Sequence, residues 1–138
     1  MIIKIFLIIS FLFSSLQPQQ FHDNNLYYYK DNQWQSIYVV EEIPIGFVSE
    51  EENTLTIRKD TNWLFAHNYI LGDLIDNLQN YKLYYNYNYY NYSYNKIYFP
   101  NYLQGIRNDI LKENEIAIMT CHDTKNGLGR IIYFFEKE

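Results

Sequence analysis

The sequence consists largely of short apolar and β-branched runs separated by clusters of turn-forming residues. Short runs of this kind, bounded by turns, are typical of β-strands. Many short strands with frequent turns predict an all-β fold, either a barrel or a sandwich, with mainly antiparallel pairing. We expect strands in Ser36–Val40, Ile43–Val48 (where Pro44 favours an edge or a strand start), Thr54–Arg58, Trp63–Ala66, Glu115–Cys121 and Arg130–Phe135.

One segment departs from the strand pattern and indicates a short helix. In Tyr69–Leu78 the apolar residues form a single helical stripe, with Asp73, Asp76 and Asn77 on the opposite side. Gly72 interrupts the segment and weakens it, so we expect the helix to be short. The residues of the stripe are Ile70, Leu71, Leu74, Ile75 and Leu78.

A tract rich in tyrosine and asparagine occupies Tyr81–Tyr98. The alternation of tyrosine and asparagine at positions 85–89 suits strand pairing, and we interpret the tract as a β-hairpin of biased composition with asparagine turns. An aromatic ligand platform and a partly disordered segment are the alternatives. Asn91–Ser93 forms an N-x-S sequon, usable in a host that glycosylates such sites.

The first residues have the features of an export signal. Lys4 supplies a positive charge, and Ile5–Leu16 is apolar except for serines, of which Ser14 and Ser15 suit a signal peptidase. The run is shorter than the roughly 20 apolar residues of a spanning helix. A buried helix of the domain is the alternative, although Gln17–Gln20 has nothing to bury. We expect a signal peptide or short N-terminal anchor at 1–16, a linker at 17–33, one domain at 34–138, and a secreted or extracytoplasmic, membrane-anchored location. An irregular first strand is the alternative for Phe21–Gln33.

The charge balance limits the partners of this chain. It has 11 Lys and Arg against 16 Asp and Glu, which gives a formal net charge of -5. Binding nucleic-acid phosphates requires clustered Lys and Arg, so we expect no nucleic-acid partner. The 138 residues are enough for one domain with one modest core.

Cys121 is the only cysteine in the sequence. An intramolecular disulfide is therefore impossible, and a lone thiol in an oxidising compartment is a liability unless it is buried or used. A buried structural cysteine and a reactive thiol are both compatible with this count. A reactive thiol needs a nearby base and gains from a nearby positive charge.

Strand geometry narrows the partners that Cys121 can have. If its strand continues, His122 points to the opposite face and can offer at most a backbone N–H. His22 lies in the expected linker, whereas His67 ends an apolar strand directly before the helix. Arg130 opens the strand after Cys121, where a guanidinium favours the thiolate and can hold an oxyanion. A structural histidine and an exposed strand-start arginine are the alternatives for these two residues.

Three motifs in this order resemble the sortase family. Ile116–Cys121, followed by a loop and Arg130, resembles the sortase Thr-Cys signature, in which the nucleophile ends one strand and an arginine begins the next. Leu64–Asn68 looks like the strand that ends in the family's catalytic histidine, and residues 72–78 resemble the helix that follows. The order of histidine before cysteine differs from that of papain-like peptidases. No arginine stands two residues after the cysteine, as it does in another common pattern of cysteine transpeptidases.

The resemblance covers about Asn53–Glu138 and implies a sortase-like closed β-barrel with one or two short helices. It implies that Cys121, His67 and Arg130 are catalytic. The enzyme would cleave a sorting motif in an exported protein or peptide through a thioacyl-enzyme and pass the acyl group to an amine acceptor. It implies no cofactor and no metal. Membrane association through the N-terminus is compatible with this activity.

The sequence departs from the sortase pattern at two places. Sortases usually have glycine before the histidine, where this chain has Ala66. The Tyr/Asn tract occupies the region of the sortase specificity loop, so the resemblance carries over no particular sorting motif. The acidic run Glu50–Glu52 lacks the ligand spacing of a calcium site. Two other functions fit the sequence: an inactive secreted β domain that binds a partner through a Tyr-rich surface, and a plain thiol peptidase.

Overall fold

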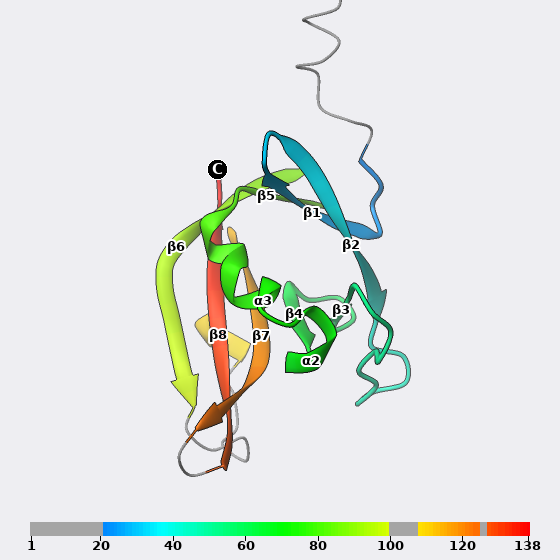
Figure 1. Ribbon diagram of the computed structural model, residues 1–138, viewed down its shortest axis with the longest axis vertical. Helices are drawn as coiled ribbons and strands as arrows, with labels where there is room; N and C mark the ends of the chain where they lie inside the picture. The colour runs from blue at the N-terminus through cyan, green and yellow to red at the C-terminus, as the bar shows by residue number, and fades with distance from the viewer. Residues whose placement is uncertain (1–20, 100–107, 125–126) are drawn as a thin grey trace, which may run out of the picture.

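The computed structural model describes residues 21–99, 108–124 and 127–138 (Figure 1). In this part of the chain, eight strands close into a barrel in the order β1-β2-β3-β4-β7-β8-β6-β5. The predicted all-β barrel with short helices is therefore confirmed. The strands are β1 (Asn25–Lys30), β2 (Gln33–Glu41), β3 (Thr54–Ile57), β4 (Trp63–Ala66), β5 (Leu83–Tyr85), β6 (Asn88–Phe99), β7 (Glu115–Thr124) and β8 (Gly127–Lys137). The helices are α2 (Asn68–Leu71) and α3 (Leu74–Asn77), with 3-10 turns η1 (Leu78–Asn80) and η2 (Asn108–Ile110).

Two parallel strand pairs interrupt the otherwise antiparallel ladders of the described residues. Strand β2 pairs in parallel with β3, and β4 pairs in parallel with β7. A parallel pair needs a long connection between its strands. Between β4 and β7 the chain forms α2, α3, β5 and β6. These helices and the β5–β6 hairpin are the long connection that allows β7 to pair in parallel with β4 (Figure 1).

Side chains alternate between the two faces of β4, β7 and β8. The barrel interior receives Leu64, Ala66, Ile118, Ile131 and Tyr133, all of them buried in the main core cluster. The outer face carries a second apolar cluster of Trp63, Ala117, Ile132 and Phe134, with Met119 packed against it. Both faces of this part of the sheet are therefore partly covered, which explains why the three strands are apolar at most positions.

The helical stripe predicted for Tyr69–Leu78 packs on the core. Ile70, Ile75 and Leu78 are buried, and Leu71 and Leu74 pack against the same cluster. The segment is split into α2 and α3 because Gly72 ends the first helix with a φ of 57°. Tyr133 of β8 fixes the second helix by donating a hydrogen bond of 2.7 Å to Asp76 Oδ1.

The Tyr/Asn tract forms the predicted hairpin. Strands β5 and β6 pair in antiparallel register, with Tyr85 opposite Asn88. The two residues between them, Asn86 and Tyr87, have φ values of 49° and 71°, the backbone that a tight hairpin turn requires. Asparagine tolerates this left-handed region better than most residues, which explains its place at the turn.

The structure corrects the sequence-based predictions at two places. β1 lies within the segment 17–33 for which we predicted a linker, and its Leu26, Tyr27 and Tyr28 are buried. The tyrosine-rich composition concealed a strand, because tyrosine can bury its ring and still satisfy its hydroxyl. Ile43–Val48, predicted as a strand, is an irregular loop after β2 in which Ile43, Ile45 and Phe47 are exposed.

The expected leader at 1–16 lies outside the described residues. Among the residues that are described, no helix has the length and apolar character needed to span a membrane.

Candidate active site

Strand register brings the three predicted site residues to one level of the sheet. In the parallel ladder, Ala66 at the end of β4 is level with Thr120 of β7, so the following residues, His67 and Cys121, come next on each strand. The φ and ψ of His67 are −61° and 145°, so it continues the extended chain for one residue before α2 begins. In the antiparallel ladder, Cys121 lies directly opposite Arg130.

The same three residues share a face. Their neighbours Ala66, Thr120 and Ile131 are buried, and Ala66 and Ile131 belong to the interior cluster. Because successive strand residues point to opposite faces, His67, Cys121 and Arg130 point outward. Directly opposed residues on one face have Cβ atoms roughly 5 Å apart, which places the thiol of Cys121 within reach of the guanidinium of Arg130.

A pocket of about 220 Å³ opens where these residues meet. Its lining has two parts, which we call the sheet wall and the loop wall. The sheet wall consists of Phe65, Ala66, His67, Met119, Thr120, Cys121 and Arg130; the loop wall consists of Glu42, Gly46 and Val48 after β2 and Arg58 after β3. His67, Cys121 and Arg130 are each partly exposed, so the thiol is not sealed in the core.

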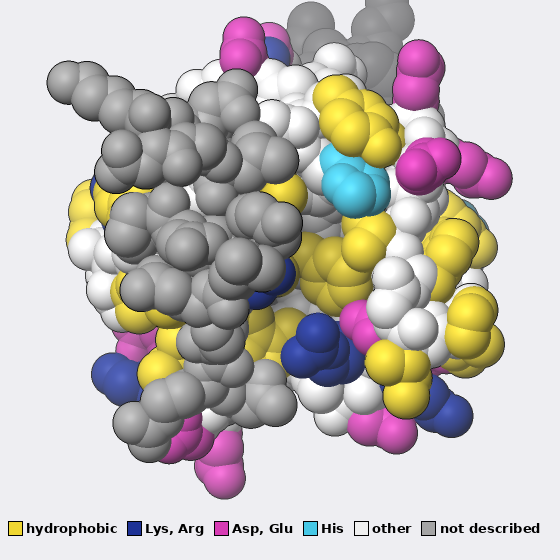
Figure 2. All heavy atoms as spheres, turned by 90° about the horizontal axis from the view of Figure 1, so that it is seen from below, with side chains coloured by type: hydrophobic (Ala, Val, Ile, Leu, Met, Phe, Trp, Pro, Cys, Tyr) yellow, Lys and Arg dark blue, Asp and Glu magenta, His cyan; other side chains and the backbone are white. Residues whose placement is uncertain are grey.

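Figure 2 shows the end of the barrel seen from below Figure 1. The surface is hollowed there, with hydrophobic side chains on the floor of the hollow. A histidine lies on one side, and Lys or Arg side chains beside an acidic side chain lie on the other. A mixed lining of this kind, apolar with a few convergent polar groups, is typical of sites that bind small molecules or short peptide segments.

The imidazole of His67 is oriented by an aromatic neighbour. Its ring stacks on that of Tyr69 with a centroid separation of 5.1 Å and an interplanar angle of 8°. The side chain makes no capping hydrogen bond to α2. Within the described residues its ring nitrogens have no hydrogen-bond partner, so they remain available to a ligand in the pocket.

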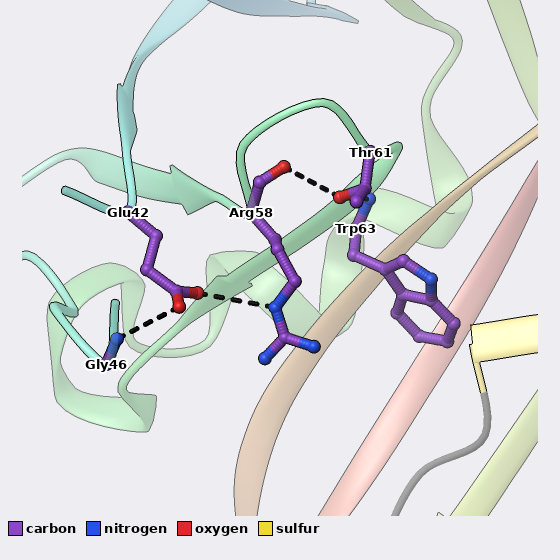
Figure 3. A network of polar contacts seen from close by, with 5 residues as sticks. All are labelled: Glu42, Gly46, Arg58, Thr61 and Trp63. Atoms are coloured by element: carbon purple, nitrogen blue, oxygen red, sulfur yellow. Dashed lines mark hydrogen bonds and ion pairs between the residues drawn. The ribbon is translucent and has the colours of Figure 1, made fainter. Parts of the chain in front are cut away.

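The loop wall contains two charged residues that the sequence patterns did not single out. Glu42 and Arg58 are paired, with Arg58 Nε 3.5 Å from Glu42 Oε2, and Glu42 Oε1 accepts a hydrogen bond of 3.0 Å from the backbone N–H of Gly46 (Figure 3). The side chain of Glu42 is only 6% exposed. No spacing in the sequence reveals this pair, because it depends on the parallel pairing of β2 with β3, in which Glu41 is level with Ile57 and Glu42 and Arg58 come next.

The backbone of Arg58 is fixed by the turn that follows it. Its N–H donates to the carbonyl of Trp63 at 3.0 Å, and its carbonyl accepts the hydroxyl of Thr61 at 2.7 Å. Thr61 Oγ1 also accepts the N–H of Trp63, at 3.2 Å. The β3–β4 turn therefore anchors the base of the Arg58 side chain.

The other two histidines have different places. His22 is exposed and precedes β1, which stands four places from β7 in the closed strand order, on the far side of the barrel. His122 is level with Gly129 in the β7–β8 ladder, but its side chain lies outside the described residues.

The chemistry available in the pocket is a nucleophile, a proton carrier and a cation. Glu50–Glu52 is exposed, and the described residues contain no group of three or more His, Cys, Asp or Glu side chains that could hold a metal ion.

Comparisons with protein-family models, with curated proteins and with solved structures gave no match to this chain.

Proposed function

We propose that the protein is a sortase-like cysteine transpeptidase that acts on exported proteins or peptides. The observation that carries this proposal is the register of β4, β7 and β8. It sets Cys121 directly opposite Arg130, while His67 follows the last pair of the β4–β7 ladder, and all three residues line one open pocket. These chemically complementary side chains come from β7, from β8 and from the residue that joins β4 to α2.

In the first half of the reaction, Cys121 is acylated. Its thiolate attacks a peptide carbonyl, a carbon–sulfur bond forms, and the negative charge moves to the carbonyl oxygen. Arg130 stabilises this oxyanion with its planar fork of N–H donors. The imidazolium of His67 donates a proton to the leaving nitrogen, the carbon–nitrogen bond breaks, and a thioacyl-enzyme remains.

In the second half, an amine takes the acyl group. The neutral imidazole of His67 removes a proton from the incoming amine as its nitrogen attacks the thioester. The carbon–sulfur bond breaks and the thiolate returns. One imidazole can serve as acid and then as base because histidine changes charge near neutral pH.

A trapping experiment tests the proposal. The protein is incubated with N-acetylated peptides of randomised sequence, and intact-protein mass spectrometry is used to search for adducts on Cys121. We expect adducts that hydroxylamine releases as peptide hydroxamates, and none with Cys121→Ala. The proposal is wrong if no adduct forms and if iodoacetamide alkylates Cys121 no faster than it alkylates a cysteine in an unstructured peptide.

Product analysis separates transfer from hydrolysis. With an added glycine-based amine, a transpeptidase yields a peptide joined to that amine, whereas a plain thiol peptidase yields the free acid in both conditions. Kinetically, an amine acceptor should accelerate turnover if its attack limits the rate.

The rival function, partner binding by an inactive domain, has an observation in its favour. An aromatic cluster covers β1, β2 and β5, in which the rings of Phe21 and Tyr84 stack with centroids 3.9 Å apart and Trp34 packs edge-on to Phe21 at 5.4 Å. If this surface is the functional one, Tyr84→Ala abolishes partner binding while Cys121→Ala leaves it unchanged.

A further inference from the structure

The pocket contains a second arginine that the transpeptidase reaction does not use. Arg130 belongs to the sheet wall and Arg58 to the loop wall, and both line the pocket into which Cys121 opens. The proposed chemistry needs one guanidinium at the oxyanion. The role of the second therefore has to be sought in what the pocket binds.

Arg58 is held in place rather than free in solvent. Its Nε approaches Glu42 Oε2 at 3.5 Å, and Glu42 is itself fixed by the N–H of Gly46. The Arg58 side chain is 50% exposed, whereas that of Glu42 is 6% exposed. Among the described residues, the two terminal nitrogens of Arg58 have no hydrogen-bond partner, so this edge of the guanidinium can still donate to a ligand.

The charge of the pocket is opposite in sign to that of the chain. Among the described residues of the lining, two arginines and one glutamate are charged, while the chain as a whole carries a formal charge of -5. The carboxylate of Glu42 is directed at Arg58 and Gly46 (Figure 3), so it orients the arginine and is not free for a ligand. The remaining positive charge favours an anionic group in the pocket.

A planar guanidinium with a free edge matches the two oxygens of a carboxylate. A second pocket, of about 450 Å³, shares Glu42 and Arg58 and is otherwise lined by Ile43, Pro44, Ile45, Lys59 and Asp60. A peptide that runs from Cys121 past Arg58 therefore meets an apolar segment next. This order suits a carboxylate followed by an apolar side chain.

We infer that Arg58 is a specificity-determining residue that binds a carboxylate of the acyl-donor peptide, and that Glu42 is the positioning residue that orients it. This inference deepens the proposed function and rests on it. The carboxylate is either an acidic side chain or the C-terminal carboxylate of a short donor.

Alkylation of Cys121 by two small reagents tests Arg58 without a known substrate. Iodoacetate and iodoacetamide react with the same thiolate and differ in carrying a carboxylate or a neutral amide. The ratio of their rate constants therefore reports anion attraction in the pocket and is independent of how much thiolate is present. The proposed catalytic function is read from the iodoacetamide rate alone, so the two ideas can fail separately.

Arg58→Gln should lower the iodoacetate-to-iodoacetamide ratio by about three- to tenfold, the effect of one charge a few ångströms from the reagent. Lys59→Gln is the matched control, because it removes one positive charge from the neighbouring exposed residue that lines only the second pocket. We expect the control to change the ratio less than about twofold. An equal ratio in Arg58→Gln and the wild type would overturn the inference.

A second variant, for which we expect the ratio to change in the opposite direction, keeps the test decisive if Arg58→Gln fails to fold. Glu42→Gln removes the negative charge but keeps an amide oxygen that can still accept the Nε–H of Arg58, so the arginine stays oriented and the ratio should rise; an unchanged or lower ratio contradicts the inference.

Donor peptides then identify the source of the carboxylate. Randomised N-acetylated peptides are offered as C-terminal amides and as free acids, and the acylated products are sequenced. Enrichment of Asp and Glu among the amides indicates a side-chain carboxylate, and a preference for free acids indicates the terminal one. Either preference should disappear in Arg58→Gln through a higher KM with little change in kcat, and the absence of both overturns the inference.

Discussion

The two walls of the pocket are built by different means. The sheet wall is a product of strand register: each of its side chains is placed by ladder hydrogen bonds and by the alternation of faces along β4, β7 and β8. In the loop wall, Glu42 and Arg58 follow the last pair of the β2–β3 ladder, and beyond that pair the wall is held by a few polar contacts around Glu42 and by the turn after Arg58. The comparison indicates that the residues to which we assign the reaction have a rigid support, whereas the residues that we assign to specificity have a support that can be altered locally.

The largest expected effect concerns the sheet wall. Cys121→Ala should abolish acyl-enzyme formation, a loss of more than about a thousandfold in turnover. Because the side chain is only partly buried, the free energy of unfolding should change by less than about 1 kcal/mol. Intact-protein mass spectrometry and urea denaturation measure the two quantities. Retained turnover in this variant would remove the sheet wall from the reaction.

The two arginines offer a direct contrast between the walls. Arg130→Lys should reduce kcat by about a hundredfold, because one ammonium cannot replace the guanidinium fork at an oxyanion. Arg58→Lys retains the charge in the loop wall and should leave kcat within about threefold of the wild type while raising KM. Steady-state kinetics with one donor peptide measure both. If the two variants lose kcat equally, the division of roles between the walls is wrong.

Gly46 tests how the loop wall is supported. It has a φ of 89°, and a Cβ added there would meet nothing within 4 Å, so any penalty in Gly46→Ala is conformational. We expect a loss of about 1 kcal/mol in local stability and a several-fold rise in KM with kcat nearly unchanged. Phe47→Ala is the control on the same loop, since Phe47 is exposed and lines neither pocket. Equal effects of both variants would mean that the backbone of Gly46 does not support Glu42.

The smallest expected effect lies away from both walls. Tyr133→Phe removes the hydrogen bond to Asp76 and should cost about 1 kcal/mol of stability, with no change in the alkylation ratio of Cys121.

Burial, together with the hydrogen bond to Asp76, raises the pKa of Tyr133 above its ordinary value of 10.0. The resulting stabilisation is fully present below pH 10 and is lost as pH rises above it. The free energy of unfolding, measured by urea denaturation at increasing pH, should therefore decrease less steeply for Tyr133→Phe than for the wild type.

More of the sheet wall than of the loop wall could be predicted from the sequence, and the reasons are physical. The proximity of Cys121 and Arg130 follows from a local hairpin, and their shared face follows from strand alternation. The approach of His67 depends on the parallel pairing of β4 with β7, which no local pattern indicates; the resemblance to sortases supplied it. Glu42 stood next to a run misread as a strand, since Ile43–Val48 has strand composition but forms an exposed loop.

The same distinction applies to β1 and to the hairpin. Periodicity and turn residues were enough to predict the β5–β6 turn at Asn86, because the positive φ that the turn requires is a local property of the chain. They were not enough for β1, whose burial depends on its pairing with β2 and with β5 far along the chain.

The position of β8 between β6 and β7 has a consequence for the order in which this molecule matures. Of the eight described strands β8 comes last in the sequence, and because it pairs with both β6 and β7 the barrel cannot close before β8 is added. Until it arrives, the thiol-bearing strand has an open edge and lacks its cationic neighbour. The pocket is therefore incomplete until β8 is in place, and the thiol of Cys121 is more open to oxidative cross-linking during that interval.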